Sequence, residues 1–161
     1  MTQFEAEQFL FEEARLLDQR HYQQWRELFG NDGIYWVPVN DGDADPQINC
    51  SIIYAQGQQL DDRLQRVQSG YFWADQPPIR TLHTVSNVSA QTENDGSVEV
   101  LANQVIYLFR ENDQRRDVPL EILPASSVYR VVNRGENWGI KYKKLLFLQA
   151  DGLMPLLPAF I

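Results

Sequence analysis

Metal-binding side chains are scarce in this chain, which has one cysteine, Cys50, and two histidines, His21 and His83, among 161 residues. A single cysteine cannot form an internal disulfide. It also excludes a Rieske cluster, which needs two cysteines and two histidines, and a zinc site of the Cys/His type. An iron site built from two histidines and a carboxylate would have to join His21, in a polar helix junction, to His83, in a predicted strand. We therefore expect neither a metal nor a cofactor on this chain.

Positive charge and long apolar runs are also lacking. The chain has 14 basic and 22 acidic residues and a formal net charge of −8, so it lacks the broad positive field that attracts nucleic acid. Its most apolar stretch, residues 152–161, contains two prolines and is shorter than the ~20 residues that span a bilayer. Residues 1–5 do not resemble the start of a signal peptide. We expect a cytoplasmic protein with no nucleic-acid and no membrane partner.

Nucleotide-binding and nucleophile motifs are missing as well. The sequence contains no Gly-x-Gly-x-x-Gly, no Walker-type phosphate loop and no Gly-x-Ser-x-Gly elbow. Cys50 falls in a predicted strand with no histidine nearby in the sequence, so we expect it to be a small buried side chain.

What the sequence does contain is enough apolar material for one core. Hydrophobic residues make up 43% of the chain and aromatic residues 12%. A length of 161 residues corresponds to about one domain, since domains usually have roughly 100–200 residues. We therefore expect a single domain over residues 1–161.

The first helix is predicted near the N-terminus. Thr2 and Glu5 have the spacing of a capping box, in which each side chain binds a free amide of the first turn. Leu10, Ala14 and Leu17 then recur at helical spacing and form an apolar face. The polar side chains that this pattern leaves for water are Glu12, Glu13, Arg15 and Asp18.

Further helices and several strands follow. Helical patterns cover residues 22–29 and 60–67, and the first of them ends at Gly30. Aromatic and β-branched residues between turn signals predict strands at residues 34–37, 48–54, 80–91, 97–110, 124–134 and 138–149. Within the second of these strands, the alternation favours burial of Ile48, Cys50, Ile52 and Tyr54.

The order of these segments indicates the fold class. Residues 97–110 carry apolar side chains on both faces, so this strand is expected to be central. Helices followed by an antiparallel meander predict an α+β fold, with the helices packed on one face of a curved sheet. The other face then needs another cover.

One residue stands out as a catalytic candidate. His83 lies in a strand and could act as a general acid or base if it points into the sheet's concave side, with Tyr35 or Tyr54 as a companion. No Asp or Glu lies at an evident inward strand position, which favours a structural or docking role for His83.

The sequence as a whole resembles a known family. Seven stretches match, in the same order, the small (β) subunit of bacterial aromatic-ring-hydroxylating dioxygenases. They are residues 11–18, 25–29, 32–38, 51–54, 60–67, 80–88 and 138–145. Lys143 and Lys144, near the end of the last stretch, look most similar to the benzoate and anthranilate type.

The resemblance implies a cystatin-like or NTF2-like cone and a partner. In this family the large (α) subunit holds the Rieske [2Fe-2S] cluster, the mononuclear non-haem iron and the substrate pocket. It receives electrons from a ferredoxin or reductase, and three large subunits associate with three small ones. The resemblance therefore implies a non-catalytic structural subunit of an enzyme that cis-dihydroxylates an aromatic compound in catabolism.

A second function stays open, because other proteins of this fold use the cone as an active site. In that alternative the chain is a free-standing lyase or isomerase that uses His83 with Tyr35 or Tyr54.

The structural-subunit function also predicts contact surfaces. We expect Leu145 and Phe147 to point outward, and residues 71–73 and 153–160 to add apolar surface for self-association and for the large subunit.

Overall fold

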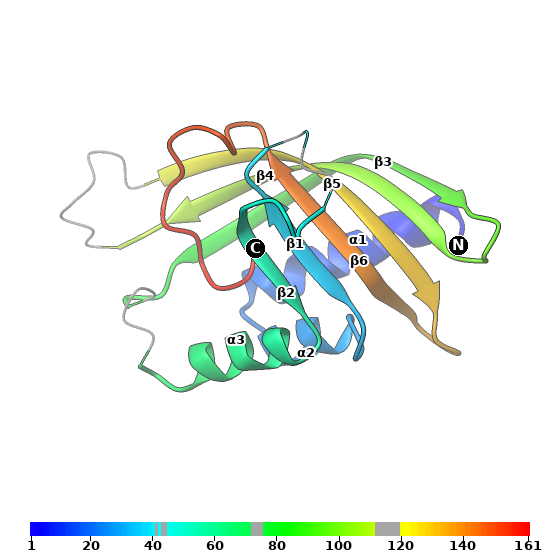
Figure 1. The fold of residues 1–161 in the computed structure, drawn as a ribbon, viewed down its shortest axis with the longest axis horizontal. Coiled ribbons are helices and arrows are strands. Elements are labelled where there is room, and N and C mark those ends of the chain that lie inside the picture. The colour runs from blue at the N-terminus through cyan, green and yellow to red at the C-terminus, as the bar shows by residue number, and fades with distance from the viewer. Residues whose placement is uncertain (41, 43–44, 72–75, 112–119) are drawn as a thin grey trace.

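The computed structural model describes residues 1–40, 42, 45–71, 76–111 and 120–161, and these form helices on a curved six-stranded sheet (Figure 1). The strand order is β2-β1-β6-β5-β4-β3. The helices are α1 (Gln3–Asp18), α2 (Tyr22–Glu27) and α3 (Gln58–Gln68). The strands are β1 (Ile34–Pro38), β2 (Ser51–Gln56), β3 (Arg80–Thr92), β4 (Val98–Phe109), β5 (Leu120–Asn133) and β6 (Trp138–Phe147). The predicted α+β class is confirmed.

Helix α1 begins at the predicted capping box. The Thr2 amide donates to Glu5 Oε2 at 2.6 Å, and the Glu5 amide donates to Thr2 Oγ1 at 3.2 Å. The predicted polar face is only partly correct, because Glu13 is buried and Asp18 is half-buried. Glu13 lies three residues after Leu10 in a 3.6-residue helix and therefore shares its buried face.

All neighbouring strands pair antiparallel except β1 with β6, which are parallel. The register shifts between Ser86 and Ser89 in β3 and between Arg130 and Val131 in β5. Asn87, inside the first shift, has a φ of 52°, a left-handed conformation that asparagine tolerates. Because bulges bend and twist a strand, these shifts contribute to the curvature of the sheet.

The edge strand β2 differs from its prediction. It begins at Ser51, so Ile48 and Cys50 precede it, and both are exposed. The inward residues are Ile53 and Ala55, which pair with Val37 and Tyr35 of β1. The predicted buried alternation is therefore wrong by one residue, and such a slip exchanges the two faces of a strand.

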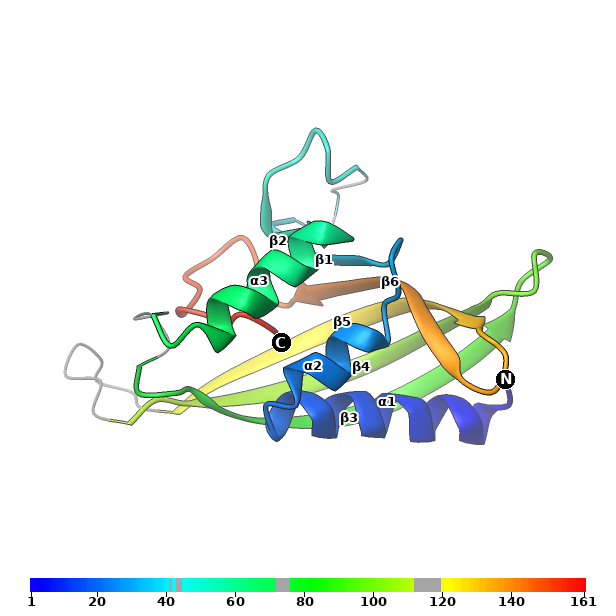
Figure 2. The ribbon, with the colours of Figure 1, turned by 90° about the horizontal axis from the view of Figure 1, so that it is seen from below.

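The helices all lie on the concave side of the sheet, as predicted (Figure 2). Helix α1 runs along β3, while α3 lies near β1 and β2. Two hydrogen bonds from Arg26 of α2 to the Asp61 carboxylate, at 2.8 and 3.1 Å, tie α2 to α3. The bidentate geometry constrains the two groups more than a single hydrogen bond would.

Strand β6 also has its faces exchanged relative to the prediction. Leu145 and Phe147 are 0% and 2% exposed and face the helices, whereas Leu146 lies on the outer face. The inward side of the neighbouring strands carries Val100, Ile106, Leu123 and Tyr129. The composition of β6 could not separate the two faces, because residues 145–147 are all apolar.

The chain after β6 returns to the concave side, where the C-terminal residue lies between α3 and the sheet (Figures 1 and 2). Leu153 and Leu156 are exposed, as expected of contact surface, but Phe160 and Ile161 are 1% and 0% exposed. The expected apolar surface over residues 153–160 is therefore wrong at its end, which is part of the core. Tyr71 is exposed, and Phe72 and Trp73 lie outside the described residues.

Candidate functional site

The centre of the cone holds an ion pair between Glu13 of α1 and Lys143 of β6. Lys143 Nζ lies 2.6 Å from Glu13 Oε1, and the two side chains are 0% and 2% exposed, respectively. Trp25 Nε1 donates to the same oxygen at 2.7 Å, and the Tyr129 hydroxyl donates to Glu13 Oε2 at 3.2 Å. Both carboxylate oxygens therefore have donors, which a buried charge requires.

The polar network continues toward β4 and β5. Gln104 Nε2 donates to the Tyr129 hydroxyl at 2.8 Å and to Ser127 Oγ at 3.2 Å. Ser127 Oγ in turn donates to the Ala102 carbonyl at 3.1 Å. Burial, together with the negative charge of Glu13, raises the pKa of Tyr129 well above its usual value. This tyrosine is therefore a neutral hydrogen-bond donor.

Tyr35, one of the predicted catalytic companions, is fully engaged with the C-terminal segment. Its hydroxyl donates to the Ile161 main-chain oxygen at 2.7 Å and accepts from the Ile161 amide at 3.1 Å. Lys143 Nζ donates to the same Ile161 oxygen at 3.1 Å. Burial raises the pKa of Tyr35 far above its usual value, so the hydroxyl stays protonated.

His83 has a carboxylate partner that strand alternation could not reveal. Its Nδ1 lies 2.6 Å from Asp18 Oδ1 at the end of α1, and its amide donates to Asp18 Oδ2 at 2.9 Å. Thr81 Oγ1 also donates to Asp18, at 2.9 Å. Burial opposes ionisation of Asp18, but the hydrogen bonds and charge of His83 outweigh it and lower the pKa of this carboxyl.

The second ring nitrogen of His83, Nε2, has different surroundings from Nδ1. The His83 side chain is 1% exposed, and its Nε2 has no hydrogen-bond partner among the described residues. The imidazole therefore binds α1 through one nitrogen only, and this pairing joins α1 to the edge strand β3.

The structure does not bring the three predicted catalytic residues together. His83 is on β3 and Tyr54 on β2, at opposite edges of the sheet. Tyr54 pairs with Trp36, one position away from Tyr35, so it lies on the face opposite to Tyr35. Its hydroxyl donates to Gln56 Oε1 at 3.3 Å. An acid–base site shared by these residues would require their side chains to converge, and in this sheet they do not.

Two of the central residues were missed by sequence reasoning, and a local signal was present for only one of them. Lys143 has the same parity as Leu145 and Phe147 in β6, and because that face was expected to point outward, the pattern did not indicate a buried lysine. Glu13 has helical spacing to Leu10 and Leu17. Their meeting across 130 positions could not be read from local pattern.

The described part of the chain contains no group of three or more His, Cys, Asp or Glu side chains that could hold a metal ion. None of its helices is long and apolar enough to cross a membrane.

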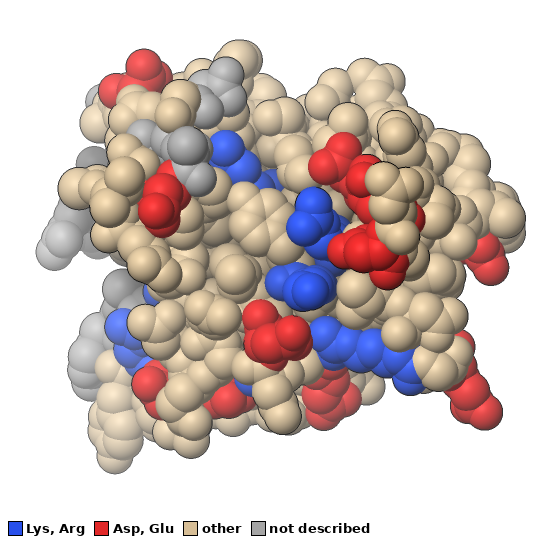
Figure 3. Space-filling view, turned by 45° about the vertical axis from the view of Figure 1, so that its right-hand side comes forward, with Lys and Arg blue, Asp and Glu red and all other residues tan. Residues whose placement is uncertain are grey.

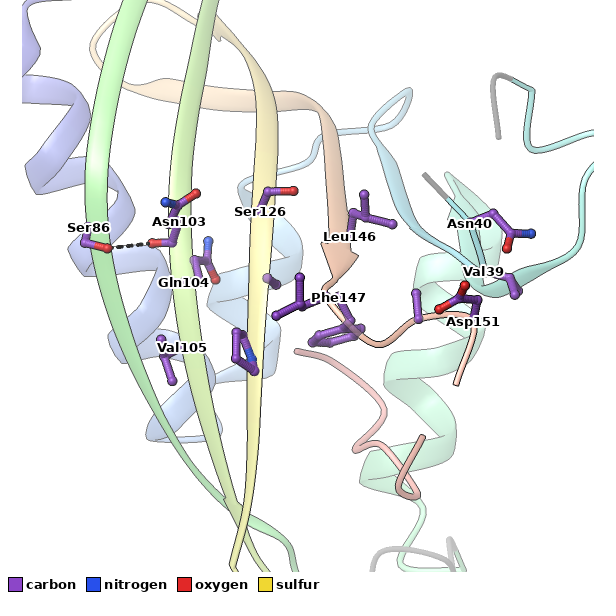
Figure 4. A pocket seen from close by; sticks show the side chains of 14 residues that line it. Val39, Asn40, Ser86, Asn103, Gln104, Val105, Ser126, Leu146, Phe147 and Asp151 are labelled. Carbon is purple, nitrogen blue, oxygen red and sulfur yellow. Dashed lines mark hydrogen bonds between the residues drawn. The ribbon is translucent and has the colours of Figure 1, made fainter. Parts of the chain in front are cut away.

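The outer face of the sheet carries a pocket of about 680 Å³ (Figure 4). A row of paired positions crosses it from β3 to β6, formed by Ser86, Asn103, Ser126 and Leu146. Asn40 and Asp151 border it from the segments that follow β1 and β6. The labelled side chains thus come from four strands and two connecting segments, and the pocket is open on a broad sheet surface.

Apolar side chains continue beyond this pocket toward one end of the sheet. Leu82, Tyr107 and Ile122 form a second row of paired positions on the outer face. Leu82 is 58% and Ile122 51% exposed. We call these three residues the outer apolar row. Contiguous exposed apolar residues of this kind mark contact sites.

On the face drawn in Figure 3, acidic and basic side chains lie near one another and are surrounded by uncharged surface. One contact on the outer sheet face is a cation–π pair, with Lys144 Nζ 4.6 Å from the centre of the Trp36 ring.

A curved sheet with helices on its concave side and a filled interior defines an α+β cone of the NTF2-like type. The family model described as the ring hydroxylating beta subunit matches residues 12–151. The benzene 1,2-dioxygenase subunit beta of Pseudomonas putida is 30% identical over 148 residues, which cover 82% of this chain and 79% of that protein. The chain belongs to the family of ring-hydroxylating β subunits.

Relatives of the benzoate type are also similar. The 2-halobenzoate 1,2-dioxygenase small subunit of Burkholderia cepacia is 34% identical over 100 residues, 59% of this chain and 61% of that protein. The alignments to this and two further curated relatives, the β subunits of toluate 1,2-dioxygenase and benzoate 1,2-dioxygenase, span 61% to 64% of their lengths.

Solved structures show the same architecture. The β subunit of benzoate 1,2-dioxygenase from Burkholderia mallei has a TM-score of 0.69 and 25% identity, over 88% of this chain and 87% of that one. A putative scytalone dehydratase from Novosphingobium aromaticivorans has a TM-score of 0.63 and 18% identity, over 89% of this chain and 83% of that one. The second likeness concerns the fold alone.

Proposed function

We propose that this chain is the non-catalytic small subunit of an oxygenase that cis-dihydroxylates an aromatic ring during catabolism. The observation that carries the proposal is the family match over residues 12–151. The benzoate-type relatives favour a substrate of that kind, an aromatic carboxylate. The large subunit selects and transforms this substrate.

The iron groups of such an oxygenase do not fit the residues of this chain. A Rieske cluster needs two cysteines and two histidines, and the chain has one cysteine. His83 binds Asp18, and His21 lies exposed at the start of α2. We therefore assign the Rieske [2Fe-2S] cluster and the mononuclear iron to the large subunit, which takes electrons from a ferredoxin or reductase.

The small subunit would act as one domain over residues 1–161, which share one buried core among the described residues. Its outer sheet face offers the apolar surface for docking, and we propose a cytoplasmic assembly of three large and three small subunits. The free-standing lyase is the weaker function, because His83, Tyr35 and Tyr54 do not converge and Tyr35 is occupied by Ile161.

Co-expression with the large subunit tests this function. We expect the two chains to purify together with the mass of three copies of each, and we expect iron and the Rieske absorption to follow the large subunit. The isolated small subunit should contain no stoichiometric iron. Tightly bound iron at one per chain, or a small subunit that never associates with the large one, would contradict the proposal.

A further inference from the structure

A groove of about 810 Å³, called the N-terminal groove below, lies between the first two helices and one end of the sheet. Its walls are the first turns of α1, the end of α2 and the turn between β5 and β6. The start of α1 and this turn lie at the same end of the molecule (Figures 1 and 2). The groove shares no lining residue with the pocket on the outer sheet face, so it is a separate surface.

Four large apolar side chains form the floor of the N-terminal groove. Phe4 and Phe9 come from α1, Leu28 from the C-cap of α2 and Trp138 from the start of β6. Phe9, Leu28 and Trp138 are partly buried and pack against the core, whereas Phe4 is 68% exposed. Aromatic side chains are enriched in protein interfaces, and a phenylalanine left in water adds little to the fold of the isolated chain. The floor therefore offers apolar surface for a partner to bury.

The rim of the groove is acidic. Glu5, Glu27 and Glu136 are exposed, and none of them forms an ion pair with a basic side chain in the described part of the chain. Hydrogen bonds with Thr2 lower the pKa of the Glu5 carboxyl, and the nearby amino terminus adds to this effect. Glu27 Oε1 accepts from the neutral Gln23 side chain at 3.3 Å. The carboxylates of Glu27 and Glu136 thus face solvent without a cation.

One basic side chain, Arg134, also lines the groove, and the main chain holds it in place. Its Nη2 donates to the carbonyls of Phe29 and Ile140, at 2.8 and 3.3 Å. A Cβ added at Gly30 or Gly139 would collide with the Arg134 guanidinium, so these two glycines make room for it. Counting this guanidinium and the amino terminus, the groove has three negative charges against two positive ones.

We propose that the N-terminal groove binds a basic segment of the large subunit. Apolar side chains of that segment would pack against Phe4 and Trp138, and its lysine or arginine side chains would pair with Glu27 and Glu136. This assignment rests on the proposed function, and it adds a contact surface on the side of α1 and α2 to the one on the outer sheet face.

Charge and ring chemistry select this occupant. An acidic segment would meet three carboxylates, and like charges brought together at an interface are costly. A second copy of this chain is a poorer match, because each copy has a net charge of −8 and repels the other. Lysine and arginine pack their alkyl stems on aromatic surface and place their charge over the rings. The aromatic floor and the acidic rim therefore favour the same side chains.

Competition for the large subunit provides the test. A limiting amount of large subunit is co-expressed with equal amounts of the unmodified chain and one variant, and mass spectrometry of the purified complex gives the ratio in which the two are incorporated. Glu27→Lys/Glu136→Lys reverses two rim charges at exposed positions, so the isolated variant should keep its fold, which circular dichroism checks. We expect the complex to contain the unmodified chain in at least about ten-fold excess, because attraction becomes repulsion at both positions.

The control variant carries the same change of charge away from the groove. Glu12→Lys/Asp62→Lys alters exposed positions of α1 and α3 that do not line the groove, and it should be incorporated as often as the unmodified chain.

The apolar floor is tested at its exposed ring. Phe4→Gln should be under-represented in the complex by about five-fold or more, the effect of losing one important interface side chain. Phe4→Tyr keeps the ring and should be incorporated almost normally. Equal incorporation of Phe4→Gln would show that the floor is not buried by the partner.

Photocross-linking identifies the occupant. In the purified complex, p-benzoylphenylalanine in place of Phe4 marks the chain that contacts the floor, and peptide mapping locates the link. We expect a large-subunit peptide that contains lysine or arginine close to the linked position. A link to a second copy of this chain, a link to a large-subunit peptide without basic residues, or no link at all would overturn the proposal.

The groove and the proposed function fail in different ways. If the unmodified chain assembles with the large subunit and Glu27→Lys/Glu136→Lys is incorporated equally, the groove has no role in docking and the function stands. If the unmodified chain never associates with the large subunit, both are wrong.

Discussion

Glu13 and Lys143 form an almost fully buried ion pair that joins the first helix to the last strand. Their atoms lie 2.6 Å apart, and the residues are 130 positions apart in the chain. A buried pair adds little net stability compared with apolar residues of the same size, because both charges lose their water. It does constrain the packing, since any arrangement that separates the pair leaves a bare charge in the core.

The first prediction concerns this pair. Lys143→Met leaves Glu13 buried without its cation and should lower the free energy of unfolding by about 3–5 kcal/mol. The double variant Glu13→Gln/Lys143→Met removes both charges and should be more stable than Lys143→Met alone. Urea unfolding of the unmodified chain, Glu13→Gln, Lys143→Met and the double variant measures the difference. If the double variant loses the sum of both single losses, the two residues are not coupled.

A second prediction concerns pH and Asp18. Its pKa is lowered in the folded chain, with the His83 hydrogen bonds outweighing burial. A carboxyl with a lowered folded pKa stabilises the fold above its unfolded pKa of about 3.9, and this contribution is lost as the pH falls through the lower folded pKa. The free energy of unfolding of Asp18→Asn should therefore fall less between pH 7 and pH 3 than that of the unmodified chain.

Glu12→Gln is the matched control for Asp18→Asn. Glu12 lies on the same helix and pairs with Arg15 at the surface, where both side chains are about 60% exposed. Its stability profile should follow that of the unmodified chain. An unchanged acid profile for Asp18→Asn would show that the contact with His83 does not contribute to folding.

A third prediction separates docking from catalysis at His83. In the assembled enzyme, His83→Asn should change turnover by only a few-fold, because the residue joins α1 to β3 and does not meet Tyr35 or Tyr54. Loss of a general acid or base would cost about 10²- to 10⁴-fold. A loss of that size in a complex of normal mass and iron content would favour the lyase-like use of the cone.

The fourth prediction tests the outer apolar row. Leu82→Lys with Ile122→Lys places two charges on the outer face and should prevent association while the isolated chain stays folded. Gln91→Lys, an exposed change on the same strand β3, is the control and should assemble normally. Light scattering and circular dichroism report mass and folding. Normal assembly of the double variant would place the interface elsewhere.

The expected outward orientation of Leu145 and Phe147 would make these positions suitable for aspartate substitutions that disrupt an interface. Both residues are instead buried in the core. Substitution there should unfold the chain whatever its partners. Apolar residues on both faces of β6 leave its orientation undetermined, and a shift of one residue exchanges the faces.

Local patterns by themselves determined the fold class, the capping box at Thr2, and the extents of α1 and of the long strands to within a few residues. Helical and strand periods are properties of neighbouring residues, so they can be read without the rest of the chain. The scarcity of cysteine and histidine likewise needed no structure, because the required ligands can be counted.

The tertiary structure alone decided the partners of Glu13, Asp18 and Ile161. Each meets its partner across 65 to 130 positions: Asp18 meets His83, Glu13 meets Lys143, and Ile161 meets Tyr35. A polar residue on an amphipathic helix can face water or a buried partner. Which of the two it faces depends on the curvature of the sheet and on the return of the chain into the cone. The free energy of a buried polar group depends on that distant partner, which no local pattern contains.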